Sequence, residues 1–429
     1  MEIFELYALF NQCNGVSTDT RNITANSIFF ALKGENFDAN EFAIQALEKG
    51  AAFAVVDNKE LLKLENNKLI HVSNVLATLQ ELASFHRYHI GLPIIALTGS
   101  NGKTTTKELI HAVLSKKYNT IATIGNLNNH IGVPLTLLRI TEETDLAIIE
   151  MGANHQGEIA ELCKIAQPDF GLITNFGKAH LEGFGGYDGV IKGKSEMFDY
   201  LKAENKTAFI NSDDPIQVDK STDLIQYKFS LNNLTDANVI LTNTSASPMA
   251  YVEYKDITIQ SQLTGTYNIA NIAYAVTIGA YFNINKEDIK VAIESYTPTN
   301  NRSQWIEKSN KKILLDAYNA NPSSMMVAIN NFTQLQGNEK LMILGDMFEL
   351  GEDSNKEHID VIQHAISSNI STIFIGENFF SVAIAHDNLQ YFNNIEAFFN
   401  CININNITKE LLLIKGSRGM ALERIVHQL

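Results

Sequence analysis

Hydrophobic and polar positions alternate along this chain in two ways that predict different elements. From Pro93 onward, short apolar runs are separated by stretches in which apolar residues recur at helical spacing, a pattern typical of a largely parallel sheet with intervening helices. The first strands expected are Ile94–Leu97, Leu146–Ile149, Gly171–Thr174 and Ala208–Ile210. Polar and β-favouring residues alternate from Val239 to Leu263, which predicts antiparallel hairpins, and the next segment, Asn268–Tyr281, is predicted to be helical.

This pattern breaks in two places and divides the chain into three predicted α/β domains. Residues 1–85 mix apolar runs with a helical stretch, and a helix over Asn74–His89 would form a rigid connector. Residues 86–298 hold the parallel strands and the hairpins. The turn-rich segment 296–301 marks the second boundary. Residues 299–429 alternate strands and helices again, with strands expected at Lys312–Leu315, Leu341–Leu344, Thr372–Ile375 and Leu411–Ile414.

Composition and charge narrow the classes of partner. A chain of 429 residues exceeds one hydrophobic core, which agrees with several domains. The formal net charge of −15 argues against nucleic acid or an anionic membrane surface as a general partner. No signal peptide or run of about 18 apolar residues is present, so we expect no membrane insertion. Three distant cysteines form no CxxC pair, which favours reduced thiols and a cytoplasmic location.

The most informative local sequence follows the strand that ends at Leu97. Glycines at 99 and 102 precede Lys103 and Thr104, and a helix is expected from Thr105 to Leu114. Strand, glycine-rich turn and helix in this order predict a P-loop, in which backbone N–H groups and the helix N-terminus hold phosphates. Lys103 would contact the outer phosphates and Thr104 would bind Mg²⁺. The usual motif has glycine at the position of Leu97, so this loop is a shorter version. Its predicted ATP-binding residues are Thr98, Gly99, Ser100, Asn101, Gly102, Lys103, Thr104 and Thr105.

Two further strands end in residues suited to magnesium-nucleotide chemistry. Glu150 directly follows the run 146–149 and offers a hard oxygen ligand, and His180 lies shortly after the run 171–174. Because Mg²⁺ prefers oxygen, the chemistry alone leaves His180 evenly balanced between a metal ligand and a hydrogen-bonding residue. For Lys192 and Lys194 the chemistry alone favours a solvated helix face.

Several longer motifs resemble those of the Mur ligases, over essentially the whole chain. In the first domain these are Ser17-Thr-Asp-Thr-Arg21 and Ile28-Phe-Phe-Ala-Leu-Lys-Gly-Glu-Asn-Phe-Asp38. In the second they are the short P-loop, Gly125-Asn-Leu-Asn-Asn-His-Ile-Gly-Val-Pro134, Glu150-Met-Gly and Thr174-Asn-x4-His180. In the third they are Asp316-Ala-Tyr-Asn-Ala-Asn-Pro322, Leu344-Gly-Asp-Met-x-Glu-Leu-Gly351 and Lys415-Gly-Ser-Arg418.

The resemblance implies an ATP- and Mg²⁺-dependent ligase that forms an amide bond through an acyl phosphate. The third-domain motifs are similar to those of family members that join D-alanyl-D-alanine to UDP-N-acetylmuramoyl-tripeptide, giving a peptidoglycan precursor. The domains would then be a UDP-sugar-binding domain (1–85), an ATP-binding P-loop domain (86–298) and a Rossmann-like domain binding the incoming dipeptide (299–429). No partner beyond these small molecules is implied, and a monomer is expected.

The resemblance also implies roles for individual residues. Lys103, Glu150, His180, Lys194 and Arg302 would be catalytic, with Glu150, His180, Thr104 and Lys194 at the metal ions. Lys194 falls where these ligases carry a carbamylated lysine, although Lys192 lies close by. Asn268 and Asn271 correspond to residues near the adenine, and Arg302 would close over the phosphates. The expected substrate-binding residues are Ser17, Asp19, Arg21, Lys33, Asn126, Asn128, Asn129, Asp316, Tyr318, Asn319, Asn321, Lys415 and Arg418.

Two rival interpretations stay open at this point. A folylpolyglutamate synthase-like ligase shares the same core, but it would lack the segments around Asp19 and Lys33. A P-loop ATPase or nucleotide-gated binding module that joins no substrates would leave the motifs at 316–322 and 415–418 without a purpose.

Overall fold

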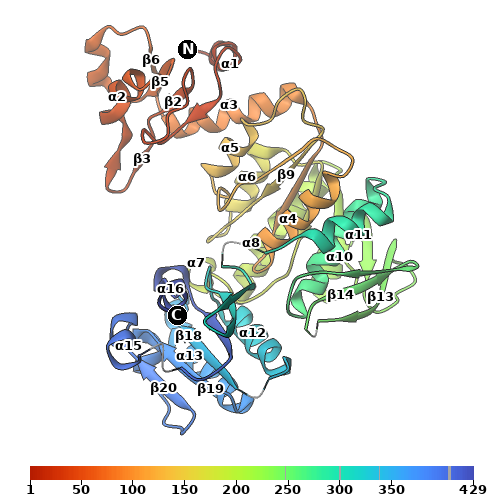
Figure 1. Cartoon of the computed structure of the whole chain (residues 1–429). Coiled ribbons are helices and arrows are strands. Elements are labelled where there is room, and N and C mark those ends of the chain that lie inside the picture. The colour runs from red at the N-terminus through yellow and green to blue at the C-terminus, as the bar shows by residue number, and fades with distance from the viewer. Residues whose placement is uncertain (247, 299–300, 338, 404–406) are drawn as a thin grey trace.

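The computed structural model describes residues 1–246, 248–298, 301–337, 339–403 and 407–429, and its three main sheets lie in separate regions of the chain (Figure 1). The predicted fold class, three α/β units in which parallel strands dominate, is confirmed. The domain boundaries stay predictions, and the one after residue 298 falls against residues 299–300, outside the described part.

The first sheet is small and fully parallel, in the order β1-β2-β5-β6. Its strands are β1 (Val16–Ser17), β2 (Ile28–Phe30), β5 (Phe53–Val56) and β6 (Leu69–His71), with a separate hairpin of β3 (Lys33–Gly34) and β4 (Phe37–Asp38). Around it lie α1 (Ile3–Phe10), η1 (Ala39–Phe42), α2 (Ala43–Glu48) and η2 (Lys59–Leu64). The predicted connector is confirmed as α3 (Val75–Ile90), which packs on α1 and on helices of the second domain.

The second sheet has nine strands in the order β15-β14-β13-β12-β11-β10-β7-β9-β8. All neighbours are parallel except the pairs β13/β14 and β14/β15, so the predicted antiparallel hairpins are confirmed. The strands are β7 (Ile94–Thr98), β8 (Thr120–Ala122), β9 (Leu146–Glu150), β10 (Phe170–Ile173), β11 (Thr207–Asn211), β12 (Ile225–Ser230), β13 (Val239–Ser245), β14 (Tyr251–Tyr254) and β15 (Ile257–Gln260). The sequence pattern did not predict β8 and β12, which are only partly buried and lack a continuous apolar run.

Helices cover both faces of this sheet because alternate side chains of its central strand point to opposite sides. Ile95 and Leu97 pack with α4 (Lys103–Leu114), α10 (Tyr267–Tyr281) and α11 (Lys286–Ser295). Ile94 and Ala96 pack with α3, α5 (Gly132–Leu137), α6 (Glu158–Ala166) and α8 (Tyr187–Ala203). The short helices α7 (Leu181–Phe184) and α9 (Pro215–Lys220) follow strands β10 and β11. A strand buried on both sides reads as an unbroken apolar run, which is why β7 was predictable.

The third sheet runs in the order β16-β17-β21-β18-β19-β20 and is parallel except for the pair β16/β17. Its strands are β16 (Gln304–Lys308), β17 (Lys311–Asp316), β18 (Lys340–Gly345), β19 (Ser371–Ile375), β20 (Leu389–Phe392) and β21 (Leu411–Lys415). Its helical elements are α12 (Pro322–Gln334), η3 (Gly351–Asp353), α13 (Ser354–Ser368), α14 (Glu377–Ser381), α15 (Ile395–Cys401), η5 (Arg418–Met420) and α16 (Glu423–Gln428). The edge strands β16 and β20 were not predicted, because neither is buried throughout.

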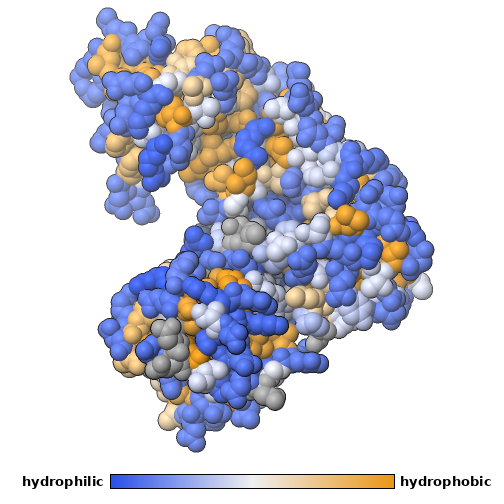
Figure 2. Space-filling view, in the orientation of Figure 1, coloured by the Kyte–Doolittle hydropathy of each residue, from blue (hydrophilic) through white to orange (hydrophobic). Residues whose placement is uncertain are grey.

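The first and third domains are both attached to the second and face each other across a hollow (Figures 1 and 2). Helix α4, which follows β7, lies between them (Figure 1). Within the described residues, no helix has the length and apolar character needed to cross a membrane.

Candidate active site

The P-loop joins the carboxyl end of β7 to α4, as predicted. Gly99 and Gly102 both have positive φ angles, +141° and +80°. A Cβ on Gly99 would lie 2.0 Å from Oγ1 of Thr174, and one on Gly102 would lie 2.6 Å from Oδ1 of Asn271. Backbone conformation and available space therefore both require glycine, and the loop is pressed against β10 and α10.

Lys103 is the first residue of α4, and its side chain folds back over the loop. Its Nζ donates to the Gly99 carbonyl at 2.6 Å and to the Ser100 carbonyl at 3.4 Å. Burial lowers the pKa of Lys103; Glu150 opposes this effect and Arg302 adds to it. The ammonium is therefore held where it would face phosphate groups at the helix N-terminus.

Glu150, at the end of β9, is almost fully buried beside the P-loop. Its Oε1 accepts hydrogen bonds from the Thr104 hydroxyl at 3.3 Å and from the Asn128 amide at 2.8 Å. Its Oε2 is also buried and has no hydrogen-bond partner among the described residues. A buried carboxylate oxygen without a partner is costly unless a cation or water meets it. Glu150 and Thr104 therefore fit Mg²⁺, which uses one or two carboxylates together with phosphates and water. The residues described contain no cluster of three His, Cys, Asp or Glu side chains that would bind a metal by themselves.

His180 lines the same cavity and has a partner from the third domain. Its Nδ1 contacts the carboxylate of Glu349, which follows β18. This contact with His180 lowers the pKa of the Glu349 carboxyl. The carboxylate therefore contacts Nδ1, and Nε2 is the ring nitrogen that could bind a metal.

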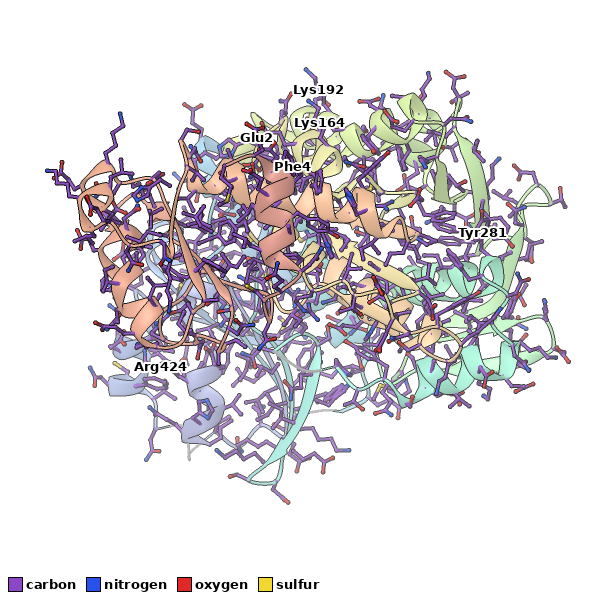
Figure 3. The ribbon with its side chains drawn as sticks, turned by 90° about the horizontal axis from the view of Figure 1, so that it is seen from above. Glu2, Phe4, Lys164, Lys192, Tyr281 and Arg424 are labelled. Carbon is purple, nitrogen blue, oxygen red and sulfur yellow. The ribbon has the colours of Figure 1, made fainter. Side chains whose placement is uncertain are left out.

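Lys192 and Lys194 lie on the same helix, α8, in opposite environments. Lys192 is exposed and lies at the outer edge of the molecule (Figure 3). Lys194 is 1% exposed, and its Nζ donates to the Ala153 carbonyl at 3.1 Å. Burial lowers the pKa of Lys194 well below its usual value, and Lys103 adds to the effect. A solvated helix face is thus right for Lys192 and wrong for Lys194, because the two residues differ by 200° around the helix.

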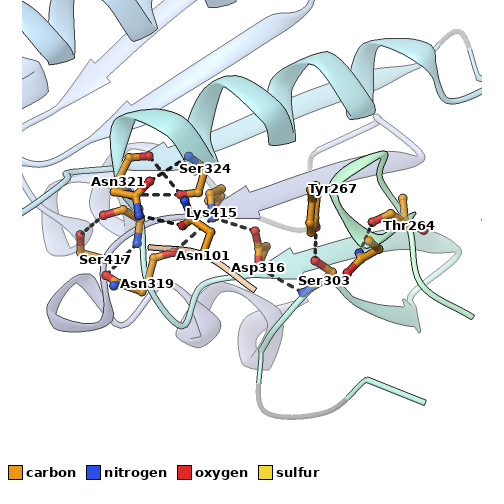
Figure 4. Close-up of polar contacts among 12 residues, drawn as sticks. Asn101, Thr264, Tyr267, Ser303, Asp316, Asn319, Asn321, Ser324, Lys415 and Ser417 are labelled. Atoms are coloured by element: carbon orange, nitrogen blue, oxygen red, sulfur yellow. Dashed lines mark hydrogen bonds and ion pairs between the residues drawn. The ribbon is translucent and has the colours of Figure 1, made fainter. Parts of the chain in front are cut away.

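The third domain contributes an ion pair at the carboxyl ends of β17 and β21 (Figure 4). Asp316 accepts from Nζ of Lys415 at 2.7 Å through one oxygen and from the Ser303 N–H at 3.1 Å through the other. Lys415 is 2% exposed and also donates to the Asn319 carbonyl. Lys415 was expected to hold a substrate carboxylate, and its closest anion in this structure is Asp316.

Tyr318 contacts two guanidinium groups that are far apart in the sequence. The guanidinium carbon of Arg302 is 3.7 Å from the centre of the ring, and that of Arg418 is 5.0 Å from it. Both distances are within the range of cation–π attraction. The tyrosine therefore holds together the two arginines that were expected to contact phosphate and dipeptide.

Polar contacts join the P-loop domain directly to the third domain. The Asn321 amide donates to Oδ1 of Asn101 at 2.8 Å (Figure 4), and the Lys178 N–H donates to Oγ of Ser323 at 2.9 Å. The Lys178 ammonium also pairs with Glu357 at 2.5 Å. Asn321 caps α12 as well, so the N-terminus of that helix is fixed against the P-loop.

One cavity of about 780 Å³ collects most of the predicted residues of the second and third domains. They are Ser100, Asn101, Gly102, Lys103, Thr104, Thr105, Asn126, Asn128, Asn129, Glu150, His180, Asn271, Arg302, Asp316, Tyr318, Asn319, Asn321 and Lys415. Five others do not line it: Thr98, Gly99, Lys194, Asn268 and Arg418. Asn268 lies behind Asn271, from which it accepts a hydrogen bond at 2.9 Å.

The predicted UDP-site residues of the first domain lie outside this cavity. Asp19 and Arg21 form an exposed ion pair, and Arg21 lowers the pKa of Asp19 to about 2. Lys33 pairs with Asp57 at 2.9 Å and lies 3.7 Å from Asp38. Ser17 ends β1, at the same carboxyl edge of the small sheet as Asp57.

Sequence reasoning assigned no role to several residues that complete the site. Glu349 is in a recognisable motif, but nothing in its spacing connects it with His180. Ser323 and Ser303 come from different parts of the third domain, and Tyr267 contacts Ser303 from the second. Only the docking of two domains brings these groups together, so no local pattern identifies them.

The fold and this cavity define a P-loop nucleotide-binding protein whose third domain closes one side of the phosphate site. Three family models match the chain: the Mur ligase family catalytic domain at residues 12–87, the Mur ligase middle domain at 97–279 and the Mur ligase glutamate ligase domain at 301–418. The chain belongs to the Mur ligase family.

Among curated relatives, the UDP-N-acetylmuramoyl-tripeptide–D-alanyl-D-alanine ligase of Bacillus subtilis is 34% identical, over 97% of this chain and 93% of its own length. The enzyme of the same name from Escherichia coli is 35% identical with the same coverage. A crystal structure of MurF from Acinetobacter baumannii matches with a TM-score of 0.86 and 31% identity, covering 96% of this chain and 92% of that one. The MurF ligase of Thermotoga maritima in complex with ADP matches with a TM-score of 0.84 and 25% identity, covering 98% and 97%.

Proposed function

We propose that this chain joins D-alanyl-D-alanine to UDP-N-acetylmuramoyl-tripeptide, using ATP and Mg²⁺ and releasing ADP and phosphate. The observation that carries the proposal is the single cavity in which the P-loop and Glu150 meet Asp316 and Lys415 of the third domain. The names of the relatives, which match over nearly the full chain, supply the substrates.

In the first step, a carboxylate oxygen of the tripeptide attacks the γ-phosphorus of ATP, and the bond to ADP breaks. The anions must be brought together against their repulsion, and the P-loop N–H groups with Lys103 and Arg302 supply the compensating charge. Mg²⁺ would neutralise phosphate oxygens further, with Thr104, Glu150 and His180 as the residues that hold it.

Lys194 is proposed to carry a carbamate. Burial and the nearby Lys103 favour its uncharged amine, which is the form that adds CO₂. Addition of CO₂ with loss of one amine proton would convert this neutral amine into an anionic oxygen ligand next to Ala153, whose carbonyl now accepts from Nζ.

In the second step, the amine of the dipeptide attacks the acyl carbon and phosphate leaves. An α-amino group titrates near roughly 8, so a usable fraction is neutral without a strong base. Asp316 and Asn319 would orient this amine, and Lys415, which lines the cavity, and the exposed Arg418 would receive the dipeptide carboxylate. Correct placement of two bound reactants is worth effective molarities of order 10⁵–10⁸ M.

We also propose where the UDP-sugar binds, where in the cell the protein is located and that it is a monomer. The first domain would bind the UDP-sugar through Ser17, Asp19, Arg21 and Lys33, after Lys33 exchanges Asp57 for phosphate. The three cysteines of the whole chain form no disulfide in the structure, and this supports a reducing, cytoplasmic location. A monomer remains our expectation.

The deciding experiment measures phosphate release from ATP with the two substrates supplied separately and together. We expect release only when both UDP-N-acetylmuramoyl-tripeptide and D-alanyl-D-alanine are present, and none when the L,L-dipeptide replaces the latter. A Lys103→Met variant should be at least 100-fold slower, because one phosphate-binding cation is lost. Release with ATP alone, unaffected by either substrate, would instead support the ATPase interpretation.

A further inference from the structure

The contact between His180 and Glu349 crosses from the second domain to the third. Nδ1 of His180 is buried and lies in ion-pair contact with the Glu349 carboxylate, and it has no hydrogen-bond partner among the described residues. His180 lines the P-loop cavity, and Glu349 is not among the described residues that do. Glu349 therefore reaches the site only through the histidine.

The backbone on each side of the contact is shaped to make it. His180 and Glu349 have φ angles of +53° and +64°, in the left-handed region that residues other than glycine and asparagine seldom adopt. Such conformations persist where the surrounding structure determines them, and they cluster at functional sites. The backbone is thus fixed at both ends of the contact, while the Glu349 side chain itself is 53% exposed.

Neighbouring contacts hold the two loops together. The Glu182 N–H donates to the Glu349 carbonyl at 3.3 Å. Gly351 also has a positive φ, and a Cβ there would lie 3.2 Å from Cβ and Cγ of Glu182. The segment after β18 is therefore packed closely on α7, immediately next to His180.

A carboxylate at Nδ1 has a defined consequence for the imidazole. It keeps the proton on Nδ1 and leaves the lone pair on Nε2, which is the tautomer that a metal ligand requires. Histidines that bind metals usually donate their other ring N–H to a carboxylate, a backbone carbonyl or water, which fixes both the tautomer and the ring orientation. Here the partner comes from a different domain than the histidine.

We propose that Glu349 is a positioning residue that prepares His180 to bind Mg²⁺, so that the metal site is complete only when the third domain is docked. The inference rests on the proposed metal role of His180. The third domain, which carries Asp316 and Lys415, would thereby also complete the metal site at which the substrate carboxylate is activated. One contact would then link activation of this carboxylate to the arrival of the dipeptide amine.

The test measures Mn²⁺ binding to the full chain in the presence of ADP and phosphate, by electron paramagnetic resonance. Mn²⁺ is a spectroscopic probe for the Mg²⁺ site. Glu349→Ala should weaken the affinity by about 10- to 100-fold, as removal of such a carboxylate does elsewhere. Glu349→Asp should recover part of the loss. Glu352→Ala is the matched control, because it removes the same charge from an exposed position on η3, and its affinity should equal that of the unmodified chain.

The outcomes separate the inference from the function on which it rests. His180→Ala should lose Mn²⁺ affinity at least as strongly as Glu349→Ala. If His180→Ala binds Mn²⁺ normally, the proposed metal role of His180 is wrong. If His180→Ala is impaired and Glu349→Ala is not, the positioning role is wrong and the metal role stands. Thermal unfolding checks that each variant is folded; if Glu349→Ala is not, Glu349→Gln takes its place, and unchanged affinity there counts against the proposal.

Discussion

Individual side chains in this protein are defined by partners that come from distant parts of the chain. Lys194 is buried beside Ala153, Lys415 is paired with Asp316, and Tyr318 lies against Arg302. Each of these contacts changes what the side chain can do: burial favours an uncharged amine, an ion pair neutralises a cation, and an aromatic ring orients a guanidinium. The chemistry of the site is therefore set residue by residue, through contacts across elements.

Substitution of Tyr318 tests whether a contact between distant residues determines how a side chain of the site binds its substrate. Tyr318→Leu removes the ring that Arg302 and Arg418 contact, and we expect KM to rise for both ATP and the dipeptide. Each contact is worth about 1 kcal/mol, so the rise should be roughly five- to tenfold for each substrate. Steady-state kinetics with one substrate varied at a time measures this. Tyr318→Phe keeps the ring and should stay close to the unmodified enzyme; an equal defect in both variants would show that the hydroxyl matters instead.

At the scale of elements, β7, the P-loop and α4 form one unit whose backbone conformation is tightly constrained. β7 is buried throughout, and α4 begins directly after Gly102, whose φ is positive. The loop is fixed by Thr174 on one side and Asn271 on the other. The backbone of the shortened motif is thereby held between the end of β10 and α10.

Gly99→Ala tests that close packing. The new Cβ would lie 2.0 Å from Oγ1 of Thr174, and the alanine backbone would have to keep the positive φ of Gly99. We therefore expect the free energy of unfolding to fall by about 3 kcal/mol. Gly157→Ala is the matched control, because Gly157 has φ +90° and open space within 4 Å of a Cβ. It should cost only about 1 kcal/mol. Urea unfolding of both variants measures the difference, and equal losses would mean that backbone strain alone matters.

At the scale of the whole molecule, contacts between the domains stabilise the arrangement in which the site is assembled. In the first half of the chain, His86 on α3 makes contacts of this kind. One ring nitrogen lies 2.9 Å from the Ile140 carbonyl and the other 3.3 Å from the Tyr7 hydroxyl. Burial lowers the pKa of His86, the Ile140 carbonyl opposes this, and His89 adds to it.

The lowered pKa of His86 predicts a loss of stability in acid. The folded state binds the proton less readily than the unfolded chain, so the stabilising contribution is complete above the unfolded pKa of about 6.5. It is lost as the pH falls below that value, by about 1.4 kcal/mol for each unit by which the pKa is lowered. Unfolding of the unmodified chain and of His86→Gln, compared between pH 8 and 5, should give a smaller pH dependence in the variant. Parallel curves would show that His86 titrates normally.

The sequence alone determined the fold class, the P-loop, Glu150 at the end of its strand and the family. These features depend on residue type and on spacing within one element: a strand buried on both faces is an apolar run, and a phosphate loop needs its glycines, lysine and threonine in order. The edge strands β8, β16 and β20 and the inner strand β12 were missed because they are only partly buried and have no such run.

Only the tertiary structure decided which of two lysines on α8 is buried, which anion lies beside Lys415 and which side chain holds His180. The sequence placed Lys192 and Lys194 two residues apart, and the direction of each around the helix becomes meaningful only when the helix is packed on the sheet. Asp316 and Lys415 are 99 residues apart, and Glu349 is contributed by a different domain than His180. Local propensity determines elements, but burial and charge pairing arise from contacts between elements, and the reactivity of a side chain depends on them.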